Sequence, residues 1–333
     1  MVRMDRRAFL RSVAVGPFLI GLSSKGRAAP PAPFRAVRGG KSVVARGQDP
    51  SVWQGGRLDE SKLGVLLDRT VAAAFGVSDA KEAWRRLFSR GERVGIKVNC
   101  LSGKHMSTNL ALVWAIIERL QEAGISGGDI VVWDRLNADL EKAGYPVRTR
   151  GQGPRFCGND YAGYYERLYA VGEIGSLVSN VVMRECDALV NVPVLKDHGI
   201  TGVTLALKNY FGAIHNPNKY HARCGDPYIA DANLIPPLRE KTRLIICDGL
   251  EAQCDGGPPY MPQWAWKYSA LLVATDPVAL DVVGWRIIEQ RRKEVGLPTL
   301  REAGREPTYI LTAADATHQL GVADPAKIEV VEA

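Results

Sequence analysis

The sequence predicts an α/β fold, in which a mostly parallel sheet is flanked by helices on both faces. Short apolar runs of strand length alternate with longer segments whose apolar residues recur at helical spacing, which is the pattern of βαβ units. The composition is that of a globular protein, with 46% hydrophobic and 24% charged residues. The chain has 333 residues, and we place a single α/β domain at residues 47–333.

The amino terminus has the pattern of an export signal. Residues 5–11 read Asp-Arg-Arg-Ala-Phe-Leu-Arg, and a mostly apolar stretch at 12–24 leads to Gly-Arg-Ala at 26–28, a small-x-small cleavage pattern. We predict a twin-arginine signal peptide over residues 1–28, read by the twin-arginine translocation machinery, and therefore a periplasmic protein. The apolar stretch is shorter than the roughly 20 residues of a membrane span, so we expect no permanent membrane anchor.

The residues after this signal, 29–46, are rich in Pro, Gly and Arg, and we predict a poorly ordered linker there. Most of the formal net charge of +7 lies in the signal, because residues 1–28 carry six basic side chains and one acidic one. The remainder is nearly neutral. This distribution lacks the basic footprint of nucleic-acid binding, and we expect no nucleic-acid partner.

The first half of the domain contains a predicted strand–helix–strand unit. A helix at about 60–75 precedes a strand at 93–99, and Ser107 or Thr108 is the predicted cap of a helix that ends at Gly124. A second strand is predicted at 129–134. At this length the order indicates two parallel strands joined by a right-handed crossover.

The same alternation returns in the second half. The predicted elements are a strand at 188–195, a helix at 200–211, and strands at 243–247 and 270–275. Asp276 is the predicted cap of a further helix, with Pro277 at its first position. The Gly- and Pro-rich segment 216–237 is expected to be irregular and to cover the site.

Polar side chains follow the predicted strands. Ligands of open parallel sheets bind beyond the carboxyl ends of the strands, so residues at these ends are candidates for a site. The predicted substrate- or cofactor-binding residues are Lys97, Asn99, Asp134, Thr204, Asn209 and Asp248. A structural alternative stays open for Asp134 and Asp248, whose carboxylates are also suited to holding turns, and Asp276 is better explained as a cap.

The segment 191–221 is the densest in reactive side chains. The predicted helix would place Thr204 and Lys208 on one face. We predict Lys196, His198 and Lys208 as catalytic residues, because lysines bind carboxylate or phosphate as point charges and a histidine can transfer protons near neutral pH. The alternative is a surface stripe that carries an exposed lysine.

Three of the five histidines also lie in this segment. His198, His215 and His221 are the predicted ligands if the site holds a divalent transition metal. No His-x-x-x-His pair is present, so acid–base roles and hydrogen-bonded loop positions remain alternatives. Six cysteines occur without a Cys-x-x-Cys spacing, which disfavours an iron–sulfur cluster.

Four motifs occur in order along the chain. They are Ile-Lys-Val-Asn at 96–99, Asn-Val-Pro-Val-Leu-Lys-Asp-His at 191–198, Leu-Lys-Asn-Tyr-Phe-Gly at 207–212, and Asp-Pro-Val-Ala-Leu-Asp at 276–281. With these motifs the chain resembles the domain of unknown function (DUF) 362 family over roughly residues 91–322. The family has no generally established activity. Some members carry iron–sulfur cysteine motifs that this chain lacks, so the resemblance implies no cluster.

We therefore expect an exported periplasmic enzyme that acts on a small anionic substrate, with a metal or other cofactor in a crevice of Lys, His and Asp side chains. The alternative is a non-catalytic periplasmic binding protein for a metal or an anionic metabolite.

Overall fold

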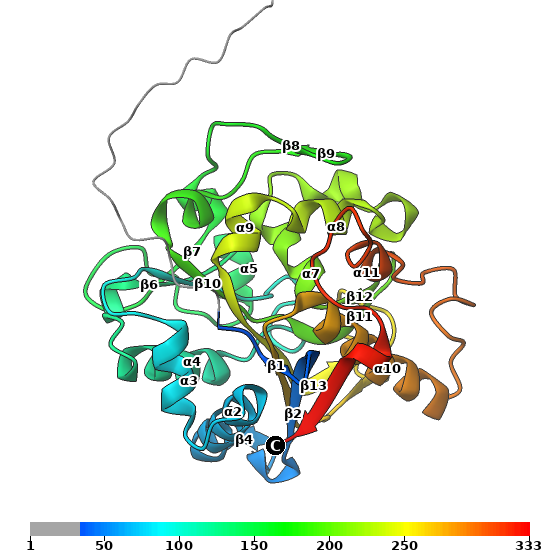
Figure 1. Ribbon diagram of the computed structural model, residues 1–333, viewed down its shortest axis with the longest axis horizontal. Helices are drawn as coiled ribbons and strands as arrows, with labels where there is room; N and C mark the ends of the chain where they lie inside the picture. Colours follow the sequence, from blue (N-terminus) through cyan, green and yellow to red (C-terminus); the bar gives the residue numbers. More distant parts are fainter. Residues whose placement is uncertain (1–33) are drawn as a thin grey trace, which may run out of the picture. The chain divides into compact units, whose positions relative to one another are not determined.

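A mixed, mostly parallel sheet of twelve strands lies at the centre of residues 34–333, the part of the chain that the computed structural model describes (Figure 1). The predicted signal peptide, 1–28, lies outside the described residues. The main path of the sheet runs in the order β1 (Val37–Arg38), β2 (Lys41–Gln48), β15 (Ala270–Ala274), β13 (Thr242–Gln253), β10 (Ala188–Asn191), β5 (Val94–Lys97), β6 (Ile130–Asp134) and β7 (Arg155–Gly158).

Three groups of partners complete this sheet. They are the pair β11 (Val194–His198) and β12 (Gly202–Thr204) beside β13, β14 (Ala265–Trp266) on β13, and β16 (Ile328–Glu332) on β2. Strands β13, β10, β5, β6 and β7 are parallel, whereas β15 is antiparallel to both of its neighbours. The predicted α/β class is confirmed.

Helices cover both faces of the sheet. One face carries α2 (Glu60–Phe75), α3 (Ala80–Leu87) and α4 (Leu110–Glu122), and the other carries α7 (Ala206–Asn209), α8 (Tyr228–Asn233), α9 (Pro236–Lys241), α10 (Pro277–Glu294) and α11 (Tyr309–Thr312). Side chains of β6 contribute alternately to the two helix layers, because successive side chains of a strand point to opposite faces of the sheet. Val132 packs with the first group of helices and Trp133 with the second.

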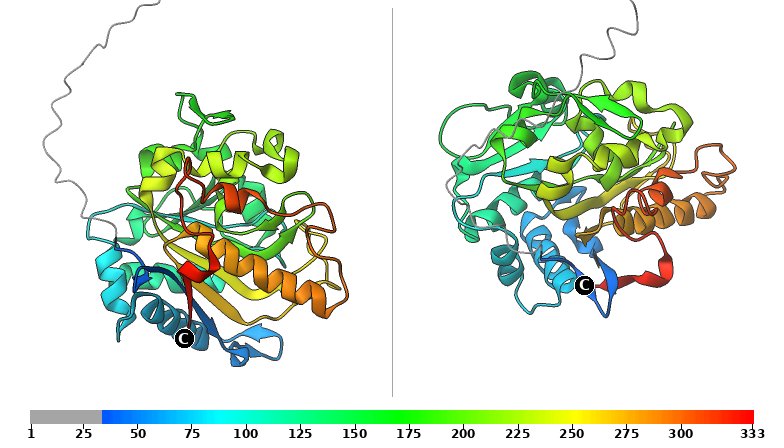
Figure 2. Two further views of the ribbon diagram at one scale, coloured as in Figure 1. Left: turned by 45° about the vertical axis from the view of Figure 1, so that its right-hand side comes forward. Right: turned by 45° about the horizontal axis from the view of Figure 1, so that its top comes forward.

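The remaining elements are short. The hairpins are β3 (Trp53–Gln54) with β4 (Arg57–Leu58), and β8 (Tyr169–Val171) with β9 (Ile174–Ser176). The second hairpin projects at the top of Figure 1 and of the left view of Figure 2. The short helices are α5 (Asn137–Lys142), α6 (Asn159–Ala162), the 3-10 turns η1 (Pro50–Val52), η2 (Gly127–Asp129), η4 (Tyr210–Ala213), η5 (Pro217–Tyr220), η6 (Ala222–Gly225) and η7 (Pro325–Lys327), and the π-helical turn η3 (Val181–Glu185).

Local signals account for several helix boundaries. Asp276 caps α10 by accepting hydrogen bonds from the backbone of Val278 and Ala279, and Pro277 occupies the first position, as predicted. The predicted cap of α4 is wrong, because Asn109 fills that position. The hydroxyl of Thr108 instead donates to the Val192 carbonyl and accepts from the Asn99 backbone, which ties three segments together.

The predicted linker is also wrong for most of its length within the structure. Residues 41–46 form the start of β2, where Val44 and Ala45 are fully buried. Strand β2 lies between β15 and β16, the latter drawn in red beside the blue β2 in Figure 2. Both partner strands come from much later in the chain, so the sequence near residues 41–48 contains no local pattern that predicts β2.

The predicted helix at 200–211 is replaced by β12, α7 and η4. Gly202 has φ +80°, and Thr204 pairs with Lys196 across an antiparallel ladder, so Thr204 and Lys208 do not share a helix face. The predicted strand at 188–195 is likewise divided: β10 ends at Asn191, and after Pro193 the chain continues as β11 along the distal part of β13.

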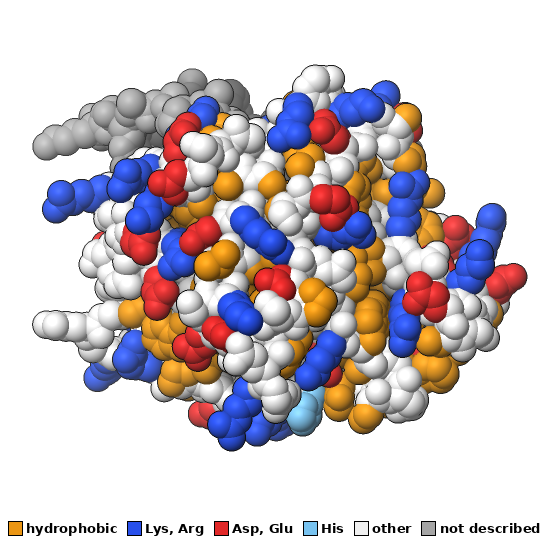
Figure 3. Space-filling model, turned by 90° about the horizontal axis from the view of Figure 1, so that it is seen from below, with side chains coloured by type: hydrophobic (Ala, Val, Ile, Leu, Met, Phe, Trp, Pro, Cys, Tyr) orange, Lys and Arg blue, Asp and Glu red, His pale blue; other side chains and the backbone are white. Residues whose placement is uncertain are grey.

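The surface of the described residues mixes both charges. On the face seen in Figure 3, basic and acidic side chains are interspersed over the elements. Within residues 34–333, no helix has both the length and the apolar character needed to cross a membrane.

Candidate functional site

A cavity open to solvent lies beyond the carboxyl ends of β5 and β6, at the place that the strand-end rule predicts. Water-sized molecules can occupy a volume of about 100 Å³ in it. Its lining residues are Lys97, Asn99, Leu101, Asp134, Arg135, Asp139, Lys196, His198, Thr204, Lys208, Asn209, Phe211, Gly212, Pro217, Asn218, His221 and Pro258. All three predicted catalytic residues lie in this lining, together with five of the six predicted binding residues.

A buried ion pair forms the floor of the cavity. The Lys97 ammonium donates to Asp134 Oδ1 at 2.7 Å, to the Val98 carbonyl at 2.5 Å and to Asn209 Oδ1 at 3.3 Å. Asp134 Oδ2 accepts the backbone N–H of Cys100 at 2.6 Å. A Cβ at Gly212 would lie 2.7 Å from Lys97 Cε, so glycine is needed where the chain passes over this lysine. Lys97, Asp134 and Asn209 therefore satisfy one another and support the site.

Two buried oxygens in the lining have no hydrogen-bond partner within the described chain. They are Asn99 Oδ1 and Thr204 Oγ1. Asn99 is oriented by its amide nitrogen, which donates to Asn209 Oδ1 at 3.1 Å. An unsatisfied buried polar atom costs about 1–3 kcal/mol, so both oxygens are suited to contact a bound ligand or water.

Lys196 enters the cavity from β11 and is 1% exposed. Its ammonium donates to Ser102 Oγ at 2.7 Å and to the Met106 carbonyl at 2.8 Å. Burial lowers the pKa of Lys196 to about 8, although the nearby Asp134 carboxylate opposes this effect. Most Lys196 side chains are therefore still charged at neutral pH.

Lys208 enters from α7 and is 7% exposed. Its Nζ lies 3.0 Å from His221 Nε2 and 4.7 Å from the centre of the Phe211 ring. Burial, followed by repulsion from Lys196, lowers the pKa of Lys208 to about 7. A far larger fraction of Lys208 side chains is therefore neutral at neutral pH than of an ordinary lysine.

The hydrogen-bond partners of His221 define its tautomer. His221 Nδ1 faces two carbonyl oxygens, of Pro217 at 3.2 Å and of Asn218 at 3.3 Å, so this nitrogen carries the proton. The lone pair of Nε2 then faces Lys208, which is the donor of their hydrogen bond. Burial, followed by the charge of Lys208, lowers the pKa of His221 to about 4.

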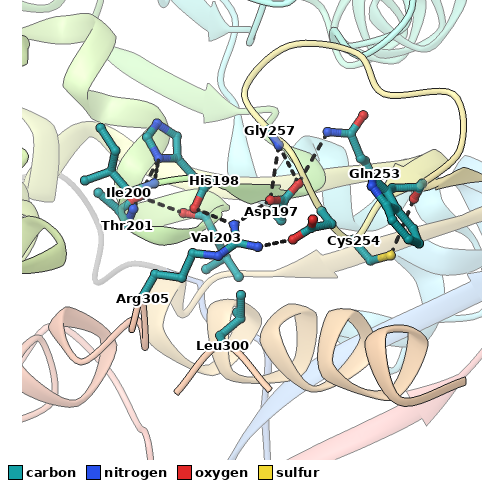
Figure 4. Close-up of polar contacts among 12 residues, drawn as sticks. Asp197, His198, Ile200, Thr201, Val203, Gln253, Cys254, Gly257, Leu300 and Arg305 are labelled. Atoms are coloured by element: carbon teal, nitrogen blue, oxygen red, sulfur yellow. Dashed lines mark hydrogen bonds and ion pairs between the residues drawn. The ribbon is translucent and has the colours of Figure 1, made fainter. Parts of the chain in front are cut away.

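His198 has the opposite tautomer. Its Nδ1 accepts the backbone N–H groups of Ile200 at 3.1 Å and Thr201 at 3.2 Å, so the proton lies on Nε2 (Figure 4). Burial, with the nearby positive charges of Lys208 and His221 next in size, lowers the pKa of His198 to about 2. This low pKa disfavours the expected proton transfer by His198 near neutral pH. Its ring stays neutral and presents an N–H donor.

An ion-pair network behind β11 fixes the strand that carries Lys196 and His198. Asp197 points to the opposite face and is fully buried, where it accepts from Arg305 at 2.8 Å and from the Gly257 backbone at 3.0 Å (Figure 4). Arg305 also donates to the His198 carbonyl and to Asp255. Because this network holds the backbone on both sides, the two cavity side chains have little freedom to move.

The structure does not bring the three predicted metal ligands together. His215 is exposed and packs edge-on against Tyr164, outside the cavity lining. His198 and His221 are stacked 5.5 Å apart, with His198 Nδ1 accepting from the backbone and His221 Nε2 facing Lys208 Nζ. Among residues 34–333 no group of three His, Cys, Asp or Glu side chains is arranged to hold a metal ion. The three histidines predicted as one ligand set are therefore not gathered at one point.

Asp248 is the predicted binding residue that lies outside the cavity. Its carboxylate accepts the backbone N–H groups of Asn109 at 2.7 Å and Leu250 at 3.0 Å, and it is 2% exposed. It anchors the start of α4 to β13, which is the structural alternative that the sequence left open. Burial raises its pKa to about 6.

Sequence reasoning missed several lining residues. Arg135 follows Asp134 at the end of β6 and had the same positional signal as its neighbour. Phe211 lies within the recognised 207–212 motif but has an apolar side chain. Asn218 and Pro258 come from loops whose approach to the site no local pattern encodes.

The chain belongs to the DUF362 family, because the model of this family, described as a domain of unknown function, matches residues 94–286. That range contains all of the cavity lining. Among solved structures, the crystal structure of a protein from Thermotoga maritima matches with 13% identity and a TM-score of 0.44, covering 74% of this chain and 61% of that one. The chain thus spans less than two thirds of that protein. No curated protein matches the chain.

Proposed function

We propose that this protein is an enzyme that acts on a small anionic substrate in the cavity after export to the periplasm. The observation that carries the proposal is the pair of buried lysines, Lys196 and Lys208, in one cavity. Within residues 34–333 neither forms an ion pair with a carboxylate. Buried cations are costly without a negative partner, so a substrate carboxylate or phosphate is the partner that this site favours.

The lining residues divide into binding and reactive groups. Lys196, mostly charged at neutral pH, attracts the anionic group of the substrate, with Arg135 as a second cation of the lining. The Nε2–H of His198 donates to a substrate oxygen without becoming charged. The free oxygens of Asn99 and Thr204 orient substrate donors. Lys208 is the reactive group, because its lowered pKa leaves a substantial fraction of its side chains as neutral amines at neutral pH.

Catalysis explains these groups better than passive capture does. A protein that only binds anions gains most from side chains that stay charged, whereas burial and repulsion remove charge from Lys208 and His198. A pKa near 7 is the value that suits an acid, a base or a nucleophile at neutral pH. The perturbed groups therefore favour an enzyme over a binding protein.

Export is the second part of the proposal. It rests on residues 5–11, where the arginine pair precedes Phe and Leu, and on the apolar stretch that follows. The expected partners are the twin-arginine translocation machinery and a small-molecule ligand.

The first experiment measures binding of acetate, succinate and inorganic phosphate to the purified protein by calorimetry. Lys196→Met should weaken the binding of the preferred anion by about 10- to 100-fold, because it removes a charged hydrogen-bond donor. Lys81→Met on α3 is the control, since Lys81 is exposed and forms an ion pair with Glu122, away from the cavity. Equal binding by wild type and Lys196→Met would refute the site.

A screen of small carboxylates and phosphate esters for turnover then separates the two classes of function. The proposal predicts turnover that Lys208→Met abolishes. Tight anion binding without turnover of any bound compound would identify a binding protein instead.

A further inference from the structure

We propose that Lys208 is a nucleophile that forms an iminium bond with the carbonyl carbon of a 2-oxo carboxylate. This inference rests on the proposed function and deepens it, because it names the substrate class and the covalent step. It starts from a difference between the two lysines of the cavity.

The partners of Lys196 hold it as a donor. Its Nζ donates to two oxygen acceptors, Ser102 Oγ and the Met106 carbonyl, an arrangement that favours the ammonium form. The Nζ of Lys208 has one acceptor, His221 Nε2, which needs only one of its N–H groups. The other near neighbour of Lys208 Nζ is the ring of Phe211, which offers no lone pair. Lys208 in its neutral form therefore keeps its own lone pair free.

The surrounding groups match the two ends of a 2-oxo carboxylate. The carboxylate has a cationic partner in Lys196, and Arg135, 3.9 Å from Asp139, is a further cation of the lining. The keto oxygen has a donor in His198 Nε2–H, for which the described chain supplies no partner of its own. A neutral imidazole polarises a carbonyl without competing for the proton of the amine. A substrate with a carboxylate beside a carbonyl uses both kinds of group.

The covalent step balances with the residues present. The lone pair of Lys208 Nζ attacks the carbonyl carbon, and the C=O π electrons move to oxygen. His221 Nε2 accepts one proton from the nitrogen and returns it to that oxygen, giving a carbinolamine. A second proton, from solvent, lets the hydroxyl leave as water. The nitrogen lone pair then completes a C=N bond, and the product is a protonated iminium that retains one N–H.

Borohydride trapping with pyruvate tests the inference on the full-length protein. Borohydride delivers hydride to the iminium carbon and converts it to a stable secondary amine, which peptide mass spectrometry locates. In the wild-type protein we expect the pyruvate adduct on Lys208 to exceed that on any other lysine by at least about tenfold. Lys241 is the internal comparison, because it is also partly buried but donates to the carbonyls of Val182 and Cys186, away from the cavity.

Two further probes separate the parts of the argument. Acetone has the carbonyl without the charge and should label Lys208 weakly, whereas acetate has the charge without the carbonyl and should protect Lys208 from pyruvate. Lys208→Met should abolish the adduct with its circular dichroism spectrum unchanged. Mapping in the wild type does not depend on the folding of this variant.

Each outcome has a distinct meaning. If acetate binds in a manner that depends on Lys196 but pyruvate labels Lys208 no more than Lys241, the iminium inference is overturned and the anionic site stands. If acetate does not bind and labelling is spread over the exposed lysines, both proposals fail.

Discussion

Two lysines of the cavity, Lys97 and Lys208, are both buried and yet differ in chemistry because their partners differ. Lys97 contacts a carboxylate, a carbonyl and an amide oxygen, which together satisfy its three donors. Lys208 contacts one imidazole nitrogen and one aromatic ring. Both are buried lysines, 1% and 7% exposed, so the hydrogen-bond partners decide which lysine is structural and which is reactive.

The structural role of Lys97 predicts a large loss of stability when it is replaced. Lys97→Met leaves the Asp134 carboxylate buried without its cation, and we expect the free energy of unfolding to fall by about 3–5 kcal/mol. The matched control is Lys81→Met, which removes an exposed ion pair and should cost less than about 1 kcal/mol. Urea unfolding measures both. If the two variants are equally stable and only Lys97→Met loses anion binding, Lys97 is a ligand-binding residue instead.

The pKa values of Lys208, the reactive lysine, and Lys196, the substrate-binding lysine, predict a bell-shaped pH dependence. Lys208 must lose its proton to attack a carbonyl, so the rate of pyruvate trapping should rise with pH through about 7. Lys196 must keep its proton to hold the carboxylate, so the rate should fall again as pH passes about 8. The measurement is the initial rate of adduct formation at a series of pH values from about 5.5 to about 9.5.

In this profile the rise of the rate at low pH, the acid limb, is assigned to Lys208, and the fall at high pH, the alkaline limb, to Lys196. The variant Lys196→Met tests this assignment. It should remove the alkaline limb, because no Lys196 proton remains to be lost. It should also move the acid limb to higher pH, since the repulsion that lowers the pKa of Lys208 is gone. An acid limb that stays in place would mean that Lys208 does not set it.

At the scale of elements, the short helix α7 depends on a carboxylate from another helix. Asp281 of α10 accepts the backbone N–H groups of Ala206 at 2.7 Å and Leu207 at 3.0 Å, and it is fully buried. Helix α7 has only four residues, so these contacts substitute for hydrogen bonds that a helix of this length lacks. Asp281 thereby positions Lys208, which follows directly.

Asp281→Asn should therefore damage the site as well as the fold. One side-chain acceptor becomes a donor that faces a backbone N–H, and we expect a loss of about 1–3 kcal/mol in the free energy of unfolding. Asp276→Asn is the control, because Asp276 caps the start of the same α10 and bonds to Ser42, away from Lys208. Both variants should lose stability in urea, but only Asp281→Asn should reduce pyruvate trapping on Lys208 in the folded protein. Equal trapping in the two would remove the positioning role.

Elements whose signals are local could be predicted, and those with distant partners could not. The start of α10 follows from Asp276 and Pro277, and the ends of β5 and β6 follow from apolar runs bounded by polar residues. Strand β2 is held by β15 and β16, more than two hundred residues away in the chain. Strand β12 exists because Gly202 lets the chain turn back onto β11. Pairing with a strand that is distant in the chain produces no periodic pattern in the sequence of β2 or β12 from which the strand could be predicted.

The same distinction applies to the site. Residues at strand ends, such as Lys97 and Asp134, were predictable because the sheet collects these ends at one edge. The contact between Lys208 and His221 was not, because it depends on the path of the chain through η4 and η5. Tautomers and pKa shifts depend on such contacts and could not come from sequence, and the low pKa of His198 is an example.

At the scale of the whole molecule, the region that matches the family model is shorter than the region that forms the fold. The match begins in β5 and ends within α10, and this range includes every residue that lines the cavity. The sheet continues beyond the match on both sides, because β1, β2 and β16 add its far edge. The site is thus built by the shared region, while the flanking segments extend the sheet on which that region rests.

The proposed export concerns residues outside the described part of the chain and has its own test. Arg6→Lys together with Arg7→Lys keeps the positive charge but removes the arginine pair that the translocation receptor reads, so the precursor should stay in the cytoplasm. Fractionation of cells that express each form, followed by immunoblotting, measures the distribution. Lys25→Arg is the control, because it changes a basic residue near the predicted cleavage site without touching the pair, and periplasmic accumulation should be unchanged. Normal accumulation of the double variant would remove the twin-arginine assignment, and the catalytic proposal would then have to be tested on a protein that reaches its compartment by another route or stays in the cytoplasm.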